Sequence, residues 1–425
     1  MTKRPATLVE KILARASNAD SVAPGDVVWA WPDIVTVPEV SFPAYVKRLR
    51  DNGIPKLARP ETMVVVIDHE VPVHSKEGAE RNRLTRQLAQ ETDVAHLFDG
   101  EGITHPLVVE RGLITPGMFV AGADTHTSSI GGAGAFAVPF GFEVTMIMAI
   151  GKIWVQVPET IRIDLTGHLA AGVTARDLVL SVMQQIDADF ANYRVIEFGG
   201  PGLSSLSVQE RMTLCGLCID MGAKTAIAEA DAVTERFLKD CGIEGVSMER
   251  SDPDCVYAAR LTIDLAELSP RVSMPPLPSN VSTVIDLPDT PIQHAYIGSC
   301  ASGTLAELTA AADILDGHTV HPSVQLLVIP ATRRIHQQAL EQGVLTRLMR
   351  AGAVISPSTC GPCFGGLAQL ADGETRISTS TRNDSGRMGS RKANIYLGSA
   401  STVAASAIVG RITDPRNYVK GGSVK

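Results

Sequence analysis

Residues 295–307, AYIGSCASGTLAE, decide the fold class. The first three residues are apolar and are followed by Gly-Ser, which predicts a short buried strand that ends there. Thr304 and Glu307 have the spacing of a capping box, which predicts a helix that begins there and runs to about Leu315. The stretch therefore contains one strand, a loop that carries Cys300, and one helix.

The same order is repeated downstream. VQLLVI (324–329) predicts a second buried strand, residues 332–349 a helix, and residues 353–355 a third strand. The third strand leads into STCGPCFGG (358–366). Strands that alternate with helices favour a parallel sheet covered by helices, so the sequence predicts an α/β fold.

The chain divides at residues 269–291, which hold six prolines and lack helical periodicity. This composition predicts a linker between an N-terminal α/β part (1–268) and a C-terminal α/β domain (292–425). The N-terminal part also alternates apolar runs with helical patterns. Met63–Ile67 is an expected strand and Lys76–Thr92 an expected helix.

Composition narrows the function. The chain has 425 residues, of which 44% are hydrophobic and 20% charged, as in an ordinary globular protein. A net charge of −8 without a basic block argues against nucleic-acid binding, and no stretch approaches the roughly 18 apolar residues of a membrane span. Seven cysteines and an N-terminal stretch without an apolar run predict a protein of the reducing cytoplasm.

Three cysteines follow predicted strands. Gly361 and Pro362 stand between Cys360 and Cys363 and exclude a regular helix there. In parallel α/β sheets ligands bind at the carboxyl ends of strands, so we expect these two thiols and Cys300 to face one crevice.

Several interpretations of these thiols compete. Three thiolates suit a [4Fe–4S] cluster with one open iron, which would act as a Lewis acid. A disulfide between Cys360 and Cys363 is disfavoured because Gly-Pro and Phe-Gly-Gly begin a helix poorly. A four-thiol zinc site with Cys215 and Cys218 is a further alternative, although that pair lies in an apolar helical pattern typical of a core.

Histidines and carboxylates occur together upstream. Asp68 and His69 end an apolar run, His105 follows an acidic stretch, and Asp124 and His126 lie in a Gly-rich segment. A carboxylate beside an imidazole fixes its tautomer and raises its basicity, as general acid–base catalysis requires.

Five motifs occur in a characteristic order: GADTHTSSIGGAGAF (122–136), YIGSCASGTLAEL (296–308), STCGPCFGG (358–366), STRNDSGRMG (380–389) and ASTVAASAIVGRITDPR (400–416). In these motifs the chain resembles the aconitase family, and most closely its branch of isopropylmalate isomerase (3-isopropylmalate dehydratase) large subunits. The resemblance spans nearly the whole chain. It implies aconitase-like three-layer α/β/α domains around a central cleft, and a [4Fe–4S] hydro-lyase that dehydrates or isomerises a small hydroxy-acid.

The resemblance also implies roles for individual residues. It assigns the cluster to Cys300, Cys360 and Cys363. Active-site polar positions match Asp68, His69, His105, Asp124 and His126, with His69 and Asp68 protonating the departing hydroxyl. Substrate-binding positions match Thr125, Arg382 and Arg387, and the arginines would hold carboxylates.

The chain departs from the family pattern at six positions. Thr125 stands where Ser is usual, Gly216 and Thr381 where Asn is usual, and Asp220 where Glu is usual. The first cysteine motif ends in Ala-Ser302 instead of Thr-Asn. These changes remove amide groups around the expected cluster, and such outer groups tune metal sites.

The sequence contains no Gly-Ser-Ser-Arg-like loop of the family's swivelling domain, which carries the serine base. The resemblance therefore implies a separate small subunit that supplies it, in a heteromer. Isopropylmalate of leucine biosynthesis is the first expected substrate. Dimethylmalate, methylmalate or citraconate, homoaconitate and aconitate are alternatives, and a non-catalytic or zinc-holding relative is the alternative class.

Overall fold

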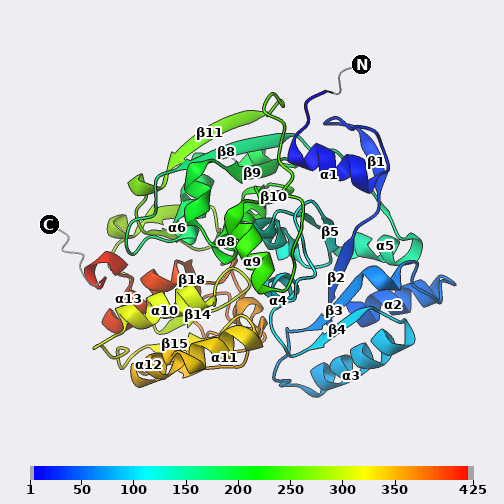
Figure 1. Cartoon of the computed structure of the whole chain (residues 1–425). Coiled ribbons are helices and arrows are strands. Elements are labelled where there is room, and N and C mark those ends of the chain that lie inside the picture. Colours follow the sequence, from blue (N-terminus) through cyan, green and yellow to red (C-terminus); the bar gives the residue numbers. More distant parts are fainter. Residues whose placement is uncertain (1–3, 187, 420–425) are drawn as a thin grey trace.

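The computed structural model describes residues 4–186 and 188–419. Within these ranges the chain forms three sheets flanked by helices and one two-stranded ribbon (Figure 1). The ribbon pairs β1 (Val27–Ala30) with β7 (Ile153–Gln156) and lies beside α1 (Leu8–Ala16). The described residues include no helix that is both long and apolar enough to cross a membrane.

The first sheet has five parallel strands in the order β4-β3-β2-β5-β6. They are β2 (Ile34–Pro38), β3 (Met63–Ile67), β4 (His96–Asp99), β5 (Phe119–Gly122) and β6 (Phe136–Pro139). All five residues of β3 are buried, and alternate residues point into separate cores on the two faces of the sheet. A strand covered on both faces is a continuous apolar run, which explains the MVVVI sequence.

Helices cover both faces of this sheet. One core includes residues of α1, α2 (Phe42–Asp51), α3 (Lys76–Glu91) and α5 (Val144–Ile150). The other includes α4 (Thr104–Glu110) and the 3₁₀ segment η2 (Thr125–Ala133).

The second sheet has four parallel strands in the order β10-β9-β8-β11. They are β8 (Thr160–Thr166), β9 (Val195–Gly199), β10 (Thr225–Ala228) and β11 (Ala259–Asp264), with helices α6 (Ala175–Gln185), α7 (Ala188–Ala191), α8 (Val208–Leu217) and α9 (Ala232–Asp240) in the connections. Residues of α6 and α8 belong to the core of this sheet.

The third sheet has the order β13-β12-β18-β17-β14-β15-β16. Its strands are β12 (Arg271–Ser273), β13 (Val281–Thr283), β14 (His294–Ile297), β15 (Gln325–Val328), β16 (Val354–Ile355), β17 (Thr375–Ser378) and β18 (Asn394–Leu397). Strands β14 to β18 are parallel, whereas β12 runs antiparallel to β18 and β13. The helices are α10 (Leu305–Ile314), α11 (Arg333–Glu341), α12 (Val344–Arg350) and α13 (Ala400–Val409).

The α/β fold class predicted from the sequence is confirmed. The side chain of Thr304 caps α10 by accepting a hydrogen bond from the backbone N–H of Glu307, as the capping box predicts. The single helix expected over 332–349 is wrong: Gly343 separates α11 from α12 with a φ of +73°, a conformation that an α-helix excludes. Residues 269–291, expected as a linker, contain β12 and β13 at one edge of the third sheet. The division into domains stays a prediction.

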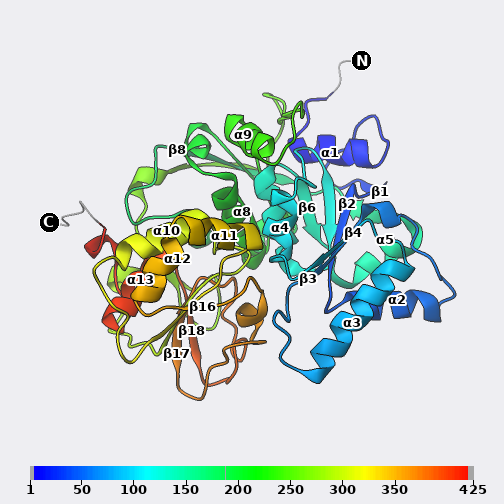
Figure 2. The ribbon, with the colours of Figure 1, turned by 60° about the horizontal axis from the view of Figure 1, so that its bottom comes forward.

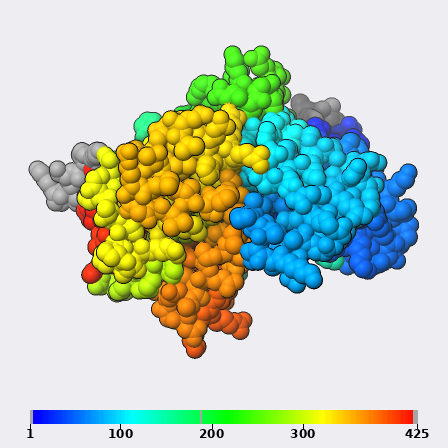
Figure 3. Space-filling view, turned by 90° about the horizontal axis from the view of Figure 1, so that it is seen from below, coloured from blue at the N-terminus to red at the C-terminus, as the bar shows by residue number. Residues whose placement is uncertain are grey.

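The parts of the chain built on the first and third sheets meet beside α4 and α11 (Figure 2). Gly102 forms an antiparallel bridge with Thr332, and the backbone N–H of Ile103 donates to the carbonyl of Ala331 at 2.9 Å. In the space-filling view the blue to cyan residues lie directly against the yellow to orange ones (Figure 3).

Segment η2 packs tightly on α8, and Gly132 makes this possible. A Cβ atom at Gly132 would lie 2.2 Å from the backbone nitrogen of Met212 in α8. We therefore expect Gly132→Ala to lower the free energy of unfolding by about 3 kcal/mol, measured by denaturant titration. Gly398→Ala is the control, because its Cβ would find its nearest neighbours at 3.5 Å. Equal denaturant midpoints of unfolding for Gly132→Ala and Gly398→Ala would contradict this packing argument.

Candidate active site

A pocket lies where the residues that follow β3 and β5 face the loops that carry Cys300, Cys360 and Cys363. It is lined by Asp68, His69, Ile103, Thr104, His105, Asp124, His126, Cys300, Cys360, Cys363, Phe364, Thr381 and Arg387. The structure thus brings together the three cysteines and all five predicted acid–base residues. Thr125 and Arg382 are predicted site residues that do not line this pocket.

Cys300 lies in the turn between β14 and α10. The preceding residue, Ser299, has a φ of +87°, which is rare for a residue with a side chain. Its buried hydroxyl donates to the carbonyl of Thr379 at 2.9 Å, just after the end of β17. The hydrogen bond between neighbouring strand ends holds the strained turn that positions Cys300.

Cys360 precedes the short 3₁₀ helix η8 (Gly361–Phe364), and Cys363 lies within it. The backbone N–H of Cys360 donates to the carbonyl of Asp68 at 2.9 Å, and the hydroxyl of Thr359 donates to the same carbonyl at 2.8 Å. The cysteine loop is therefore fastened to the end of β3. All three cysteines are free thiols.

The three thiols differ in acidity. A hydrogen bond with Cys360 lowers the pKa of Cys363 well below its ordinary value, helped by the charge of Arg387. The same hydrogen bond and burial raise the pKa of Cys360, while burial raises the pKa of Cys300. A bound metal ion favours the deprotonated form of such thiols. The three thiols are therefore suited to bind a cationic inorganic centre.

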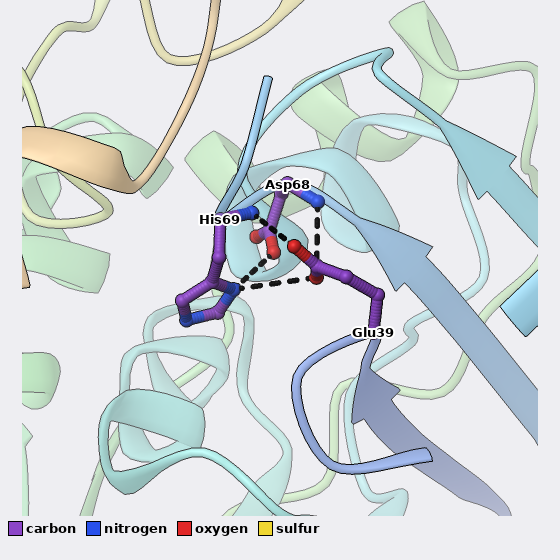
Figure 4. Close-up of side chains that lie close together, drawn as sticks. All are labelled: Glu39, Asp68 and His69. Atoms are coloured by element: carbon purple, nitrogen blue, oxygen red, sulfur yellow. Dashed lines mark hydrogen bonds and ion pairs between the residues drawn. The ribbon is translucent and has the colours of Figure 1, made fainter. Parts of the chain in front are cut away.

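His69 has two carboxylates beside its Nδ1 atom (Figure 4). Nδ1 lies 2.7 Å from Oδ1 of Asp68 and 3.5 Å from Oε2 of Glu39. Burial alone would lower the pKa of His69, but Asp68 and then Glu39 raise it well above its ordinary value. The other ring nitrogen, Nε2, points away from both carboxylates and can interact with a further group (Figure 4).

Glu39, at the end of β2, was not anticipated from the sequence. It is fully buried, and its carboxylate accepts backbone hydrogen bonds from Asp68, His69 and Glu70 at 3.3, 2.8 and 3.1 Å. The ligand atoms of Glu39, Asp68 and His69 lie within 4.8 Å of one another. Because three N–H groups already occupy the Glu39 oxygens, we interpret this cluster as a support for His69.

Two more histidine–carboxylate pairs line or border the pocket. Nε2 of His105 lies 2.9 Å from Oδ1 of Asp124, and His105 is the main group that holds the pKa of Asp124 low against the effect of burial. Nε2 of His126 lies 3.3 Å from Oδ2 of Asp220. Burial lowers the pKa of His126, but Asp220 raises it above its ordinary value overall.

Asp220 links His126 to an arginine. Its other oxygen accepts a hydrogen bond from Nε of Arg382 at 2.7 Å, and only 2% of the Asp220 side chain is exposed. Sequence reasoning noted Asp220 only as a departure from the family pattern. Arg387, in contrast, lines the pocket and donates from Nε to the carbonyl of Cys363 at 3.1 Å.

The remaining cysteines lie outside this pocket. Cys215 and Cys218 are buried in the core of the second sheet, as their apolar helical pattern predicts. Burial raises the pKa of both thiols. The donor set that fits an inorganic centre is therefore the pocket trio.

Glu307 lies in the first turn of α10, the helix that follows the Cys300 turn, and it should make the stability of the chain depend on pH. Burial raises its pKa to about 7, so the folded chain keeps a proton that the unfolded chain releases near 4.5. Stability should therefore fall as pH rises from about 4.5 to 7. Relative to Glu307→Gln, we expect the metal-free wild type to lose roughly 3 kcal/mol across this window. If the free energies of unfolding of the wild type and Glu307→Gln, measured by denaturant titration, changed equally with pH, this expectation would be contradicted.

Comparisons with known proteins agree with the geometry. A sequence model of the aconitase family (aconitate hydratase) matches residues 10–289 and 284–410. "3-isopropylmalate dehydratase large subunit 1" of Methanopyrus kandleri is 43% identical over 417 residues, which cover 97% of this chain and 99% of the relative. The "3-isopropylmalate dehydratase large subunit" of Aquifex aeolicus is 39% identical, with 97% and 98% covered.

A solved structure shows the same fold. The aconitase X of Thermococcus kodakaraensis, in its holo-form, superposes with a TM-score of 0.50 at 13% identity, covering 88% of this chain and 89% of that chain. At this identity the likeness supports the fold alone. The family match and the two relatives cover nearly the whole chain, and on that basis this chain belongs to the aconitase family.

Proposed function

We propose that this chain is the large subunit of a hydro-lyase that removes water from a small hydroxy di- or tricarboxylic acid and adds it back at the neighbouring carbon. The expected pair of acids is 3-isopropylmalate and 2-isopropylmalate. The pocket lined by three thiols and Arg387, with three histidine–carboxylate pairs in or beside it, is the observation that carries this proposal. The names of the relatives support the substrate.

Cys300, Cys360 and Cys363 would hold a [4Fe–4S] cluster. The residues fit this group, because three free thiols from two loops line one pocket and sulfur is the ligand that iron–sulfur clusters require. With three protein ligands, a bound cluster supplies one open iron as a Lewis acid for substrate oxygen atoms.

His69 would donate the proton to the departing hydroxyl. Asp68 and Glu39 stabilise its imidazolium form through Nδ1, so an acidic proton remains on the ring at neutral pH. Arg387 and Arg382 would bind substrate carboxylates through their forked N–H groups. Asp220 already orients Arg382.

His105, Asp124 and His126 would orient the water that leaves and returns. Each histidine has a carboxylate partner that fixes its ring, so the donors are already in place before substrate binds. The base that removes the carbon-bound proton would be a serine from a separate small subunit. The proposal therefore predicts that this chain needs a partner for turnover.

A substrate screen tests the function. The chain, purified anaerobically with its small subunit, would be offered isopropylmalate, dimethylmalate, citramalate, homocitrate and citrate, and formation of the alkene product followed by ultraviolet absorbance. We expect the highest kcat/KM with isopropylmalate and no turnover by the large chain alone. Turnover of none of these acids by the cluster-loaded complex would contradict the proposal.

A further inference from the structure

Tyr296, on β14, has a buried hydroxyl without a partner. The side chain is 0% exposed, and its hydroxyl makes no hydrogen bond to any residue that the structure describes. A buried tyrosine hydroxyl usually finds a partner, because leaving it unpaired costs free energy. The described residues therefore leave this hydroxyl without a hydrogen-bond partner, so its donor capacity is free for a group that binds beside it.

The Tyr296 ring lies over the turn that leads to Cys300. A Cβ atom at Gly298 would come within 2.6 Å of the Tyr296 hydroxyl oxygen, so only glycine lets the ring lie across that position. Tyr296 and Gly298 are two residues apart and hence on the same side of the strand. The ring thus extends along β14 toward its carboxyl end, where the cysteine turn begins.

Strand β14, which carries Tyr296, leads directly into the turn that holds Cys300. Burial first, and then the negative charges of Cys363, Cys360 and Cys300, raise the pKa of Tyr296 well above its ordinary value. The phenol therefore keeps its proton and can donate a hydrogen bond to a negative group. Sulfur atoms of these thiolates, or inorganic sulfide held between them, are acceptors of that kind.

We propose that the Tyr296 hydroxyl donates a hydrogen bond to a sulfur atom of the iron–sulfur group held by Cys300, Cys360 and Cys363. This inference rests on the proposed function. It makes Tyr296 a positioning residue for the cofactor and not a catalytic residue. A hydrogen bond to cluster sulfur stabilises the more negative, reduced form and therefore raises the reduction potential.

Tyr296→Phe separates this role from a packing role, because it removes only the hydroxyl. In the metal-free chain the variant should be as stable as the wild type or more stable, since an unsatisfied buried group is removed. In the complex with its small subunit and cluster, we expect iron loss to a chelator to be about tenfold faster, as loss of one hydrogen bond to a charged group predicts. The reduction potential should shift to a lower value.

Tyr396→Phe is the matched control. Tyr396 lies on β18 of the same sheet and, unlike Tyr296, is only partly buried. We expect it to change neither iron loss nor potential.

Equal iron-loss rates and potentials for wild type and Tyr296→Phe would overturn the inference. So would a clear loss of stability in metal-free Tyr296→Phe, because the hydroxyl would then have a protein partner. If the wild type itself binds no iron and sulfide, the proposed function fails as well, which distinguishes the two results.

Discussion

Cys360→Ser is expected to abolish hydratase activity while leaving the fold intact. Serine keeps the backbone N–H that donates to Asp68, so η8 should stay fastened to β3. The hydroxyl, however, replaces a thiolate that we assign to the cluster. Activity should fall by more than about a hundredfold, since even outer partners of a metal site cause losses of that size. The measurement is turnover of the reconstituted complex.

The control for this variant is Cys241→Ser. Cys241 follows α9 and does not line the pocket. It should retain wild-type turnover and iron content, and both variants should unfold within about 1 kcal/mol of the wild type. Unchanged turnover of Cys360→Ser would refute the ligand assignment.

His69→Asn is expected to lower kcat by roughly 10²- to 10⁴-fold, the usual contribution of a positioned acid. Asparagine can still hydrogen-bond to Asp68, but it offers no proton to the departing hydroxyl. KM should change little, because the arginines and not His69 would bind the carboxylates. The measurement is the steady-state kinetics of the complex with isopropylmalate.

The pH profile adds a second readout for His69. Because Asp68 and Glu39 raise its pKa, the wild type should keep its acidic proton, and thus its activity, well above pH 6.5. Activity should decline only when pH passes the raised pKa, and this limb should vanish in His69→Asn. His74→Asn, at an exposed position outside the pocket, is the control. Loss of activity in both variants to the same extent would contradict the assignment.

Much of the fold could be predicted because several of its strands are short, fully buried apolar runs. The strand at Met63–Ile67 is buried on both faces, so its sequence is a short apolar run. A surface helix would instead include polar residues on its exposed face. We could predict that the three cysteines lie close together because the carboxyl ends of parallel strands lie at the same edge of a sheet. The break between α11 and α12 was missed because a single glycine at 343 did not outweigh the helical pattern on either side.

The site was predicted less completely than the fold. Asp68, His69 and the cysteines stand at strand ends, where the sequence indicates chemistry. Glu39 follows β2 in the same way, but its role depends on three backbone N–H groups of a distant segment, which no sequence pattern records. The pairing of Asp220 with His126 and Arg382 likewise joins three separate segments, and only the folded chain brings them together.

The central claim is that three thiols from two loops hold an iron–sulfur cluster. The most direct measurement is the content of iron, zinc and acid-labile sulfide in the complex purified without oxygen. The account predicts iron and sulfide in equal amounts, about four of each per chain, and their loss in Cys360→Ser. Stoichiometric zinc with no acid-labile sulfide would contradict it.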